Sequence, residues 1–214
     1  MNDEIINDAR HAFEMLRHGD ITNAIRVSGE ALARADSRWR QSVNAKSDTS
    51  ETELNTLLQT GYTHSESLIA AGEWREAYSL ALILLYCTAI DKSRTMSIDR
   101  GCLVLWLRTL DSLNELTSNM PKDDQVITEH VTTIISYIVS MVYVVYNRLL
   151  KANDVNPVMV DAFETLRQYS FVVKTPFIDV AGDRVDPIID FLPIMADLIG
   201  RSRALGIFNV ETEI

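Results

Sequence analysis

The sequence predicts an all-α fold, and three observations support this prediction. Apolar residues recur every three or four positions along most of the first 170 residues, which is the period of an amphipathic helix. None of the 5 prolines occurs in the first 120 positions, and long helices need this because proline removes a backbone donor. Gly19 and Gly72 each separate two helical stretches, as residues that end helices do.

Length and composition limit the classes of protein that the chain can represent. With 214 residues, 47% of them hydrophobic, the chain can bury a substantial core as one domain. A net charge of -10 argues against nucleic-acid binding and favours a basic partner. Cys87 and Cys102 lie in apolar helical stretches, so we expect two buried free thiols. The acidic first ten residues contain no apolar secretory segment, so we expect a cytoplasmic protein.

The first half of the chain is expected to form four helices. They span approximately residues 3–18, 21–40, 51–71 and 72–91. Gly19 ends the first helix and Asp20 caps the second, and so short a turn makes the two helices antiparallel neighbours. Gly61, inside the third helix, either permits close packing or marks a bend.

The second half is expected to hold further helices and an irregular C-terminal segment. The expected helices span approximately residues 98–117, 123–151, 157–170 and 186–202. Residues 171–187 lack a helical period, and a short strand at 171–174 fits their composition. Pro193 should kink or split the last helix. We therefore predict a helical array over residues 1–170, with an irregular segment over 171–214 packed on the same domain.

The helix at 123–151 is expected to be the long, central and nearly all-buried helix of the fold. Residues 131–146 contain no charged side chain. This run of 16 residues is shorter than the ~20 needed to cross a membrane, so we predict no membrane association. Polar residues spaced 4, 3, 4, 3 and 4 apart draw one stripe along the helix. They are Glu129, Thr133, Ser136, Ser140, Tyr143 and Asn147.

No motif for catalysis, phosphate binding or a metal site is present. His11, Glu14 and His18 share one helix face and could bind a metal, but no second unit of this kind accompanies them. We interpret this face as solvated and predict no catalytic residue, metal or cofactor.

A basic cluster lies on and after the second helix. Arg26, Arg34, Arg38 and Arg40 surround Trp39 and could bind phosphate or an acidic motif. Because Glu30 and Asp36 are interspersed, we interpret the cluster as a solvated face of mixed charge.

Two of the expected turns have the same chemistry. Each consists of glycine, an acid, a bulky apolar residue, two variable residues and alanine. The residues are Gly19, Asp20, Ile21 and Ala24 in one turn, and Gly72, Glu73, Trp74 and Ala77 in the other. Glycine accepts a left-handed backbone, the acid caps the next helix, the bulky residue packs across the hairpin and alanine lets the helices touch.

These turns resemble the turn between the two helices of a tetratricopeptide repeat. Ala31 and Leu32 also fall where that repeat commonly has Ala-Leu. The resemblance covers about two half-repeats, and the two glycines are 53 positions apart (72 minus 19), against about 34 in the standard repeat. It implies antiparallel hairpins stacked in a right-handed array. It also implies a partner-binding groove on the first helix of each hairpin, with Met15, Tyr62, Ser65 and Leu68 as candidate contacts.

Three functions follow as hypotheses. The first is an adaptor or chaperone that binds a peptide or a partner helix, favoured to be basic, through these residues and the stripe of the long helix. The alternative is a structural homo-oligomer, for instance a homodimer, in which Thr133, Ser136, Ser140 and Tyr143 pack against a second copy. A small-molecule binder or an enzyme has the least support. The apolar run at residues 185–195 is also long enough to occupy the protein's own groove.

Overall fold

The computed structural model describes residues 2–90, 96–169 and 192–208, and every regular element in this part is a helix. The all-α prediction is therefore confirmed. The helices are α1 (Asn2–Arg17), α2 (Ile21–Asn44), α3 (Ser50–Ala70), α4 (Trp74–Ile90), α5 (Met96–Ser118), α6 (Gln125–Lys151), α7 (Val158–Gln168) and α9 (Leu192–Ala204). The strand expected at 171–174 and the start of the last expected helix lie outside the described residues.

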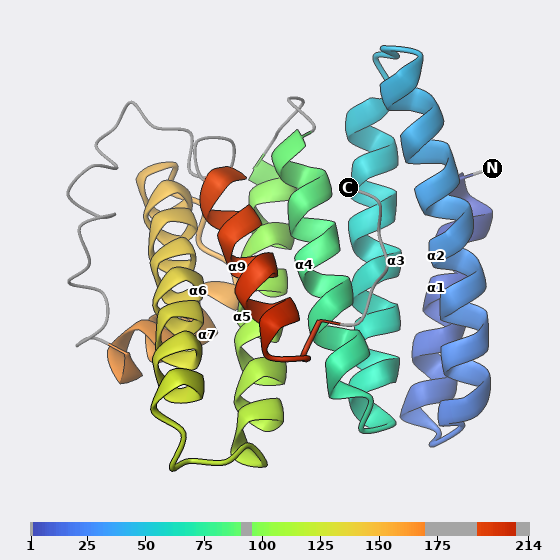
Figure 1. The fold of residues 1–214 in the computed structure, drawn as a ribbon. Coiled ribbons are helices and arrows are strands. Elements are labelled where there is room, and N and C mark those ends of the chain that lie inside the picture. Colours follow the sequence, from blue (N-terminus) through green and yellow to red (C-terminus); the bar gives the residue numbers. More distant parts are fainter. Residues whose placement is uncertain (1, 91–95, 170–191, 209–214) are drawn as a thin grey trace.

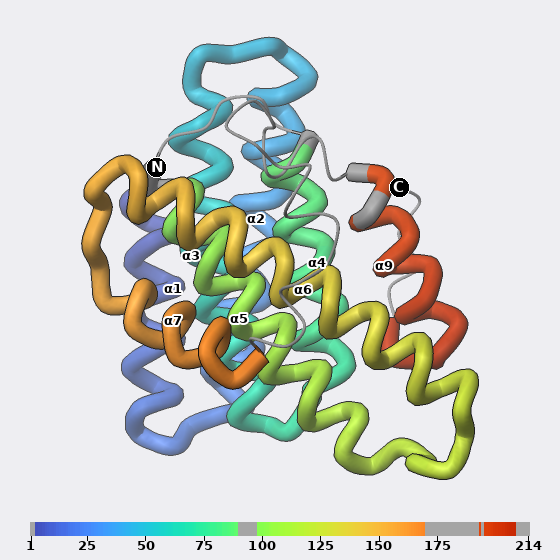
Figure 2. Tube along the Cα trace, turned by 90° about the vertical axis from the view of Figure 1, so that its left-hand side faces the viewer, coloured from blue at the N-terminus to red at the C-terminus, as the bar shows by residue number. Residues whose placement is uncertain are grey.

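The first six helices run alternately up and down as three consecutive antiparallel pairs (Figure 1). Helix α3 packs against α1, α2, α4 and α5, while α5 packs against α3, α4, α6 and α7. Helices α1, α3, α5 and α7 lie toward one side of the molecule (Figure 2). Helices α2 and α4 lie toward the other side, with α9 beyond them, and α6 crosses from the first side to the second (Figure 2). We call α1, α3, α5 and α7 the inner row of helices, and α2 and α4 the outer row.

The two repeated turns have the same backbone geometry. Gly19 and Gly72 adopt φ angles of 82° and 79°, the left-handed conformation that the sequence predicts. In each turn the glycine N–H bonds to the carbonyl three residues back, and the next N–H bonds to the carbonyl five residues back. Ala24 and Ala77 are fully buried where the next helix begins. Local chemistry at these four positions therefore sets both hairpins.

The core is built mainly from α3, α4 and α5. Trp106 on α5 and Tyr78 on α4 are among its largest fully buried side chains. Gly61 brings α3 close to α4, because a Cβ atom placed there would lie 2.2 Å from Leu84 Cδ1. Of the two alternatives for Gly61, the structure thus supports close packing. Cys87 and Cys102 are buried free thiols, as predicted.

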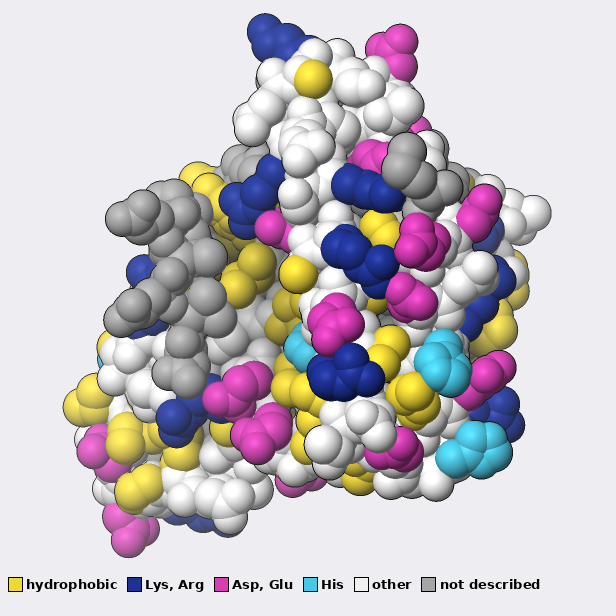
Figure 3. All heavy atoms as spheres, turned by 90° about the vertical axis from the view of Figure 1, so that its right-hand side faces the viewer, with side chains coloured by type: hydrophobic (Ala, Val, Ile, Leu, Met, Phe, Trp, Pro, Cys, Tyr) yellow, Lys and Arg dark blue, Asp and Glu magenta, His cyan; other side chains and the backbone are white. Residues whose placement is uncertain are grey.

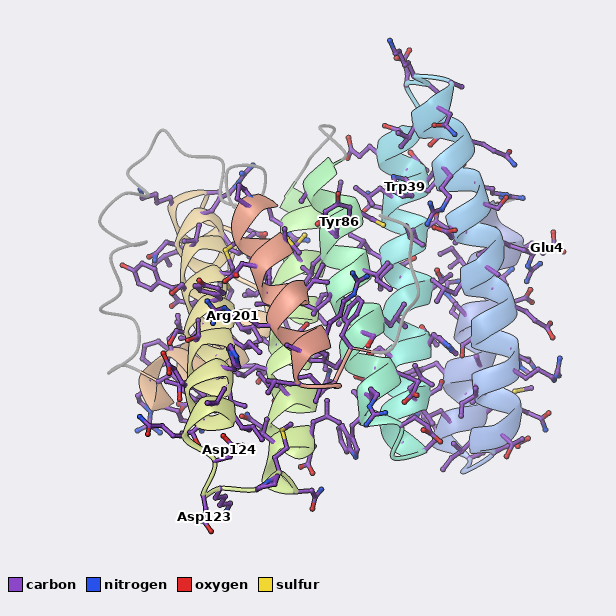
Figure 4. All side chains as sticks on the ribbon, in the orientation of Figure 1. Glu4, Trp39, Tyr86, Asp123, Asp124 and Arg201 are labelled. Carbon is purple, nitrogen blue, oxygen red and sulfur yellow. The ribbon has the colours of Figure 1, made fainter. Side chains whose placement is uncertain are left out.

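Helix α6 differs from the prediction of a central, nearly all-buried helix. It begins after Asp124, whose carboxylate accepts a hydrogen bond from the Val126 N–H at 2.9 Å (Figure 4). Among the described helices it packs only against α5, α7 and α9, at the end of the molecule remote from α1 (Figure 1). It is the single described helix that is long and apolar enough to cross a membrane, a property that core helices of soluble proteins share. Within its most apolar 18-residue window, 44% of the residues are buried.

Helix α9 packs against α4 of the outer row and against α6. Arg201 lies on the side of α9 that faces α6 (Figure 4) and places a guanidinium nitrogen 3.1 Å from His130 Nδ1. Tyr78 and Ser202 share a buried hydrogen bond of 2.7 Å between α4 and α9. Pro193 lies in the first turn of α9, where a proline is tolerated, so the described helix is not split.

Candidate binding groove

Three adjoining pockets form one groove along the inner row of helices. The α1–α3 pocket has a volume of about 360 Å³, the α3–α5 pocket about 470 Å³ and the α5–α7 pocket about 240 Å³. Tyr62 lines all three. Gln59 lines the first two, and Val104 lines the last two. Because these shared side chains join the pockets, we treat the three as a single groove.

A polar stripe on α3 forms the floor of the groove. Asn55, Gln59, Tyr62 and Glu66 are spaced 4, 3 and 4 apart, so they share one helix face. Almost every other part of α3 is covered by a neighbouring helix, since α3 packs against four of them. The stripe is therefore the part of α3 that stays open to a partner. Its amide side chains can both donate and accept hydrogen bonds, as a peptide backbone requires.

The wall at α1 combines apolar and basic side chains. Ile6, Ala9 and Phe13 line the α1–α3 pocket, and Phe13 is 39% exposed. Arg10 and Arg17 are exposed at the same wall. An exposed aromatic ring beside guanidinium groups is typical of residues that dominate the energy of protein interfaces.

The wall at α5 and α7 is acidic. Arg108 Nε lies 2.7 Å from Glu66 Oε1, and Arg108 NH1 lies 3.4 Å from Asp111 Oδ2. The Arg108 guanidinium carbon is 6.0 Å from the centroid of the Tyr62 ring, at the outer limit of a cation–π contact. Asp161 on α7 lines the same pocket. The Arg108 guanidinium is thus paired with two carboxylates, and a third carboxylate lines the same pocket.

Two carboxylates of this wall, Glu66 and Asp111, hold their protons more tightly than free side chains do. Burial raises the pKa of Glu66, against the opposing effect of Arg108. Burial also raises the pKa of Asp111, and the nearby Asp161 and Glu115 add to this, again against Arg108. Arg108 therefore offsets only part of the cost that burial places on ionising these two carboxylates.

Arg100, at the α3–α5 pocket, is held by its own chain. Its Nε and NH2 groups donate to the two carboxylate oxygens of Asp154 at 2.6 and 2.5 Å. The preceding residue, the buried Asp99, pairs with Arg148 Nε at 2.8 Å. These two ion pairs connect α5 with the last turn of α6 and with the segment that follows it, so the middle of the groove is close to neutral.

The structure brings one of the sequence-predicted contacts into the groove. Tyr62 is its shared residue, whereas Ser65 and Leu68 are buried on other sides of α3. Met15 is half-buried on α1 and does not line the pockets. The sequence analysis missed Gln59 and its neighbours, although their 4, 3, 4 spacing with Tyr62 was a usable signal.

The stripe on α6 is not part of the groove. Ser136 and Ser140 donate hydrogen bonds to carbonyl oxygens of their own helix at 2.8 and 2.7 Å. Asn147 bonds the Tyr143 carbonyl oxygen at 2.9 Å in the same way. Ser140 is buried, so its hydroxyl is closed to a partner. A homodimer assembled through this stripe stays a prediction.

The basic cluster of α2 lies on a face of mixed charge, where Lys and Arg side chains alternate with Asp and Glu (Figure 3). Arg26 pairs with Glu30 at 3.0 Å, and Arg40 pairs with Asp36 at 2.8 Å. Arg34 pairs with Asp8 of α1. These arginines are therefore engaged by neighbouring acids, in agreement with the interpretation of a solvated face.

Two further groups of polar residues have side chains that could bind a metal or act in catalysis. In the part of the chain that the structure describes, no three His, Cys, Asp or Glu side chains are placed to hold a metal ion, and His11 and His18 are exposed. Ser28 Oγ lies 2.8 Å from His64 Nδ1 between α2 and α3, but Ser28 is fully buried and bonds the Ala24 carbonyl oxygen. This pair joins two helices and is closed to a substrate.

Comparisons of the chain with models of protein families, with curated proteins and with solved structures gave no match. The class that the fold and the groove define is that of an all-helical protein with an elongated surface groove.

Proposed function

We propose that the protein is a cytoplasmic adaptor or chaperone that binds an extended segment or a helix of a protein partner in the groove. The observation that carries this proposal is the continuity of the three pockets through Tyr62. Together the three pockets extend across four helices, α1, α3, α5 and α7, so they suit a long ligand better than a compact one.

The groove has the composition of a peptide-binding surface. Tyr62 and Phe13 offer partly exposed apolar area, and burying such area supplies affinity. Asn55 and Gln59 offer amide groups that can pair with a peptide backbone. Charged residues lie at both ends and can fix the register of the ligand.

The arrangement of helices gives further support. We interpret the hairpins as a divergent tetratricopeptide-like array, because the turns at Gly19 and Gly72 repeat and the first helix of each hairpin contributes to the groove. Repeat proteins of this kind use such surfaces for binding partners. The C-terminal segment does not occupy the groove in its described part, since α9 packs on the outer row.

The proposal is tested by selecting binders from a displayed library of random 12-residue peptides. A selected peptide is then mixed with protein that carries a photo-crosslinking benzoylphenylalanine in place of Gln59. Gln41, an exposed glutamine on α2 outside the groove, is the matched control position. We expect crosslinking from position 59 and none above background from position 41.

Substitution of the shared tyrosine provides a second measurement. Tyr62→Ala should weaken binding of the selected peptide by about tenfold or more, since truncating an aromatic residue at an interface centre often exceeds 1 kcal/mol. Tyr86→Ala, at a half-buried tyrosine on α4 (Figure 4), is the control for loss of a tyrosine elsewhere. Equal crosslinking from positions 59 and 41, or unchanged affinity of folded Tyr62→Ala, would contradict the proposal.

A further inference from the structure

The charge of the groove changes sign along its length. At the α1 wall, Arg10 and Arg17 outnumber the single acid Glu14 that lines the same pocket. Both arginines are exposed, and neither forms an ion pair with a described residue. The α1 end of the groove is therefore cationic.

The opposite end carries the reverse charge. Asp111 and Asp161 line the α5–α7 pocket, and Arg108 is the only basic residue among its described lining residues. Arg108 already forms an ion pair with Glu66, whose Oε1 lies 2.7 Å from Arg108 Nε. Arg108 is thus paired with the carboxylates of Glu66 and Asp111, whereas Asp161 forms no ion pair with a described residue.

Burial raises the pKa of Glu66 and of Asp111, and Arg108 offsets only part of that effect, so a further cation would favour the ionised form of both carboxylates. The pocket volume of about 240 Å³ is far larger than one water molecule needs and leaves room for the end of one long side chain.

We propose that the partner segment binds in a single direction, with a Lys or Arg side chain in the α5–α7 pocket and an Asp or Glu side chain over Arg10 and Arg17. This inference rests on the proposed groove function. Between the two ends, the segment lies over Tyr62, and Asn55 and Gln59 face its backbone. The partner is consequently an amphipathic peptide with opposite charges at its ends, rather than a uniformly basic one.

Peptides selected from the random library give the first test. We expect enrichment of a basic residue toward one end and an acidic residue toward the other, in a constant order. For a selected peptide, Asp161→Asn should weaken binding by about two- to fivefold, the range for a partly exposed ion pair. Asp161→Glu should restore most of the affinity, because it returns the charge. Glu164→Gln on the same helix is the control, since Glu164 is exposed and bonds Arg167 instead.

The cationic end is tested in the same way. Arg10→Gln should weaken binding about two- to fivefold, whereas Arg26→Gln, which removes an exposed arginine on α2, should leave it unchanged. Both effects should shrink as the salt concentration is raised from about 0.05 to about 0.5 M, because this shortens the screening length about threefold.

Direction is established by charge reversal. Asp161→Lys should reject the selected peptide and accept a peptide whose basic residue is changed to Glu. Arg10→Glu should not gain binding of the peptide whose basic residue is changed to Glu. If peptides crosslink from position 59 but charge changes at both ends have no effect, the inference on direction is overturned while the groove stands. If neither end matters and no crosslink forms from position 59, the groove proposal itself fails.

Discussion

Gly61 is the position where one added methyl group tests the contact between α3 and α4. A Cβ atom there would lie 2.2, 3.1 and 3.2 Å from Leu84 Cδ1, Cδ2 and Cγ. Carbon atoms that are not bonded prefer about 3.5 to 4.0 Å, so the whole end of the leucine has to move. Leu84 is only 2% exposed, and little room is left for this movement.

The magnitude follows from two opposing effects. Overpacking a dense core costs about 1 to 3 kcal/mol, and contact with all three terminal carbons of Leu84 argues for the upper part of that range. Alanine is favoured over glycine inside a helix by about 1 kcal/mol. We therefore expect Gly61→Ala to lower the free energy of unfolding by about 2 kcal/mol. For a chain of this length, that corresponds to a melting temperature lower by about 4 to 8 °C.

Gly200 provides a matched control on α9. A Cβ atom at Gly200 would meet nothing within 4 Å, so Gly200→Ala gains helix propensity without a clash. It should raise the free energy of unfolding by up to about 1 kcal/mol. Urea unfolding followed by circular dichroism measures both variants. The interpretation would be wrong if Gly61→Ala were as stable as Gly200→Ala.

A double-mutant cycle identifies the clash. Leu84→Ala alone should cost about 2 to 5 kcal/mol by leaving a cavity. In that background, Gly61→Ala should be neutral or stabilising, because the atoms it would strike are gone. An unchanged cost of Gly61→Ala in the Leu84→Ala background would show that the effect does not come from this contact.

Two further predictions concern the turns and a buried histidine. Gly72→Ala places a side chain at a φ of 79° and should cost about 1 to 2 kcal/mol of unfolding free energy, with a similar cost for Gly19→Ala, in urea titrations; a variant as stable as wild type would be unexpected. Burial lowers the pKa of His64, so the folded state binds this proton less readily than the unfolded state does. His64 therefore stabilises the fold above about pH 6.5, and this contribution is lost as the pH falls through the lowered folded-state pKa. The loss of unfolding free energy between pH 7.5 and 5 should be smaller in His64→Asn than in wild type, and an equal loss would refute the assignment.

The features that depended on local chemistry could be predicted from the sequence. The turns at Gly19 and Gly72 form because the required backbone and the buried alanines are set within a few residues. The helix boundaries follow for the same reason, since caps and apolar periods are local signals.

The groove residues depended on how the helices are rotated against one another. Helix α3 is buried on most sides, so apolar periodicity alone does not indicate which stripe stays open. Ser65 and Leu68 lie within a turn or two of Tyr62 on the same helix, yet the neighbouring helices bury them. The polar stripe of α3 was the better predictor of the groove, although its spacing resembles that of the polar stripe on α6.

The sequence predicted a central position for α6, and this prediction was wrong for a similar reason. Its apolar length indicates how much surface it must bury, but not its place in the stack. Burial is supplied by α5, α7 and α9 together, so a helix at the end of the described array can be as apolar as a central one.

Helix α9 acts mechanically as a brace. It contacts α4 and α6, which do not contact each other in the described part of the chain. In a stack of hairpins, each hairpin contacts only its neighbours. The curvature of such a stack determines the width of its concave binding surface. Through contacts such as the hydrogen bond between Tyr78 and Ser202, α9 joins α4 to α6, so we expect it to limit movement of these two helices relative to each other. We therefore expect contacts on the α9 side of the protein to limit changes in the width of the groove.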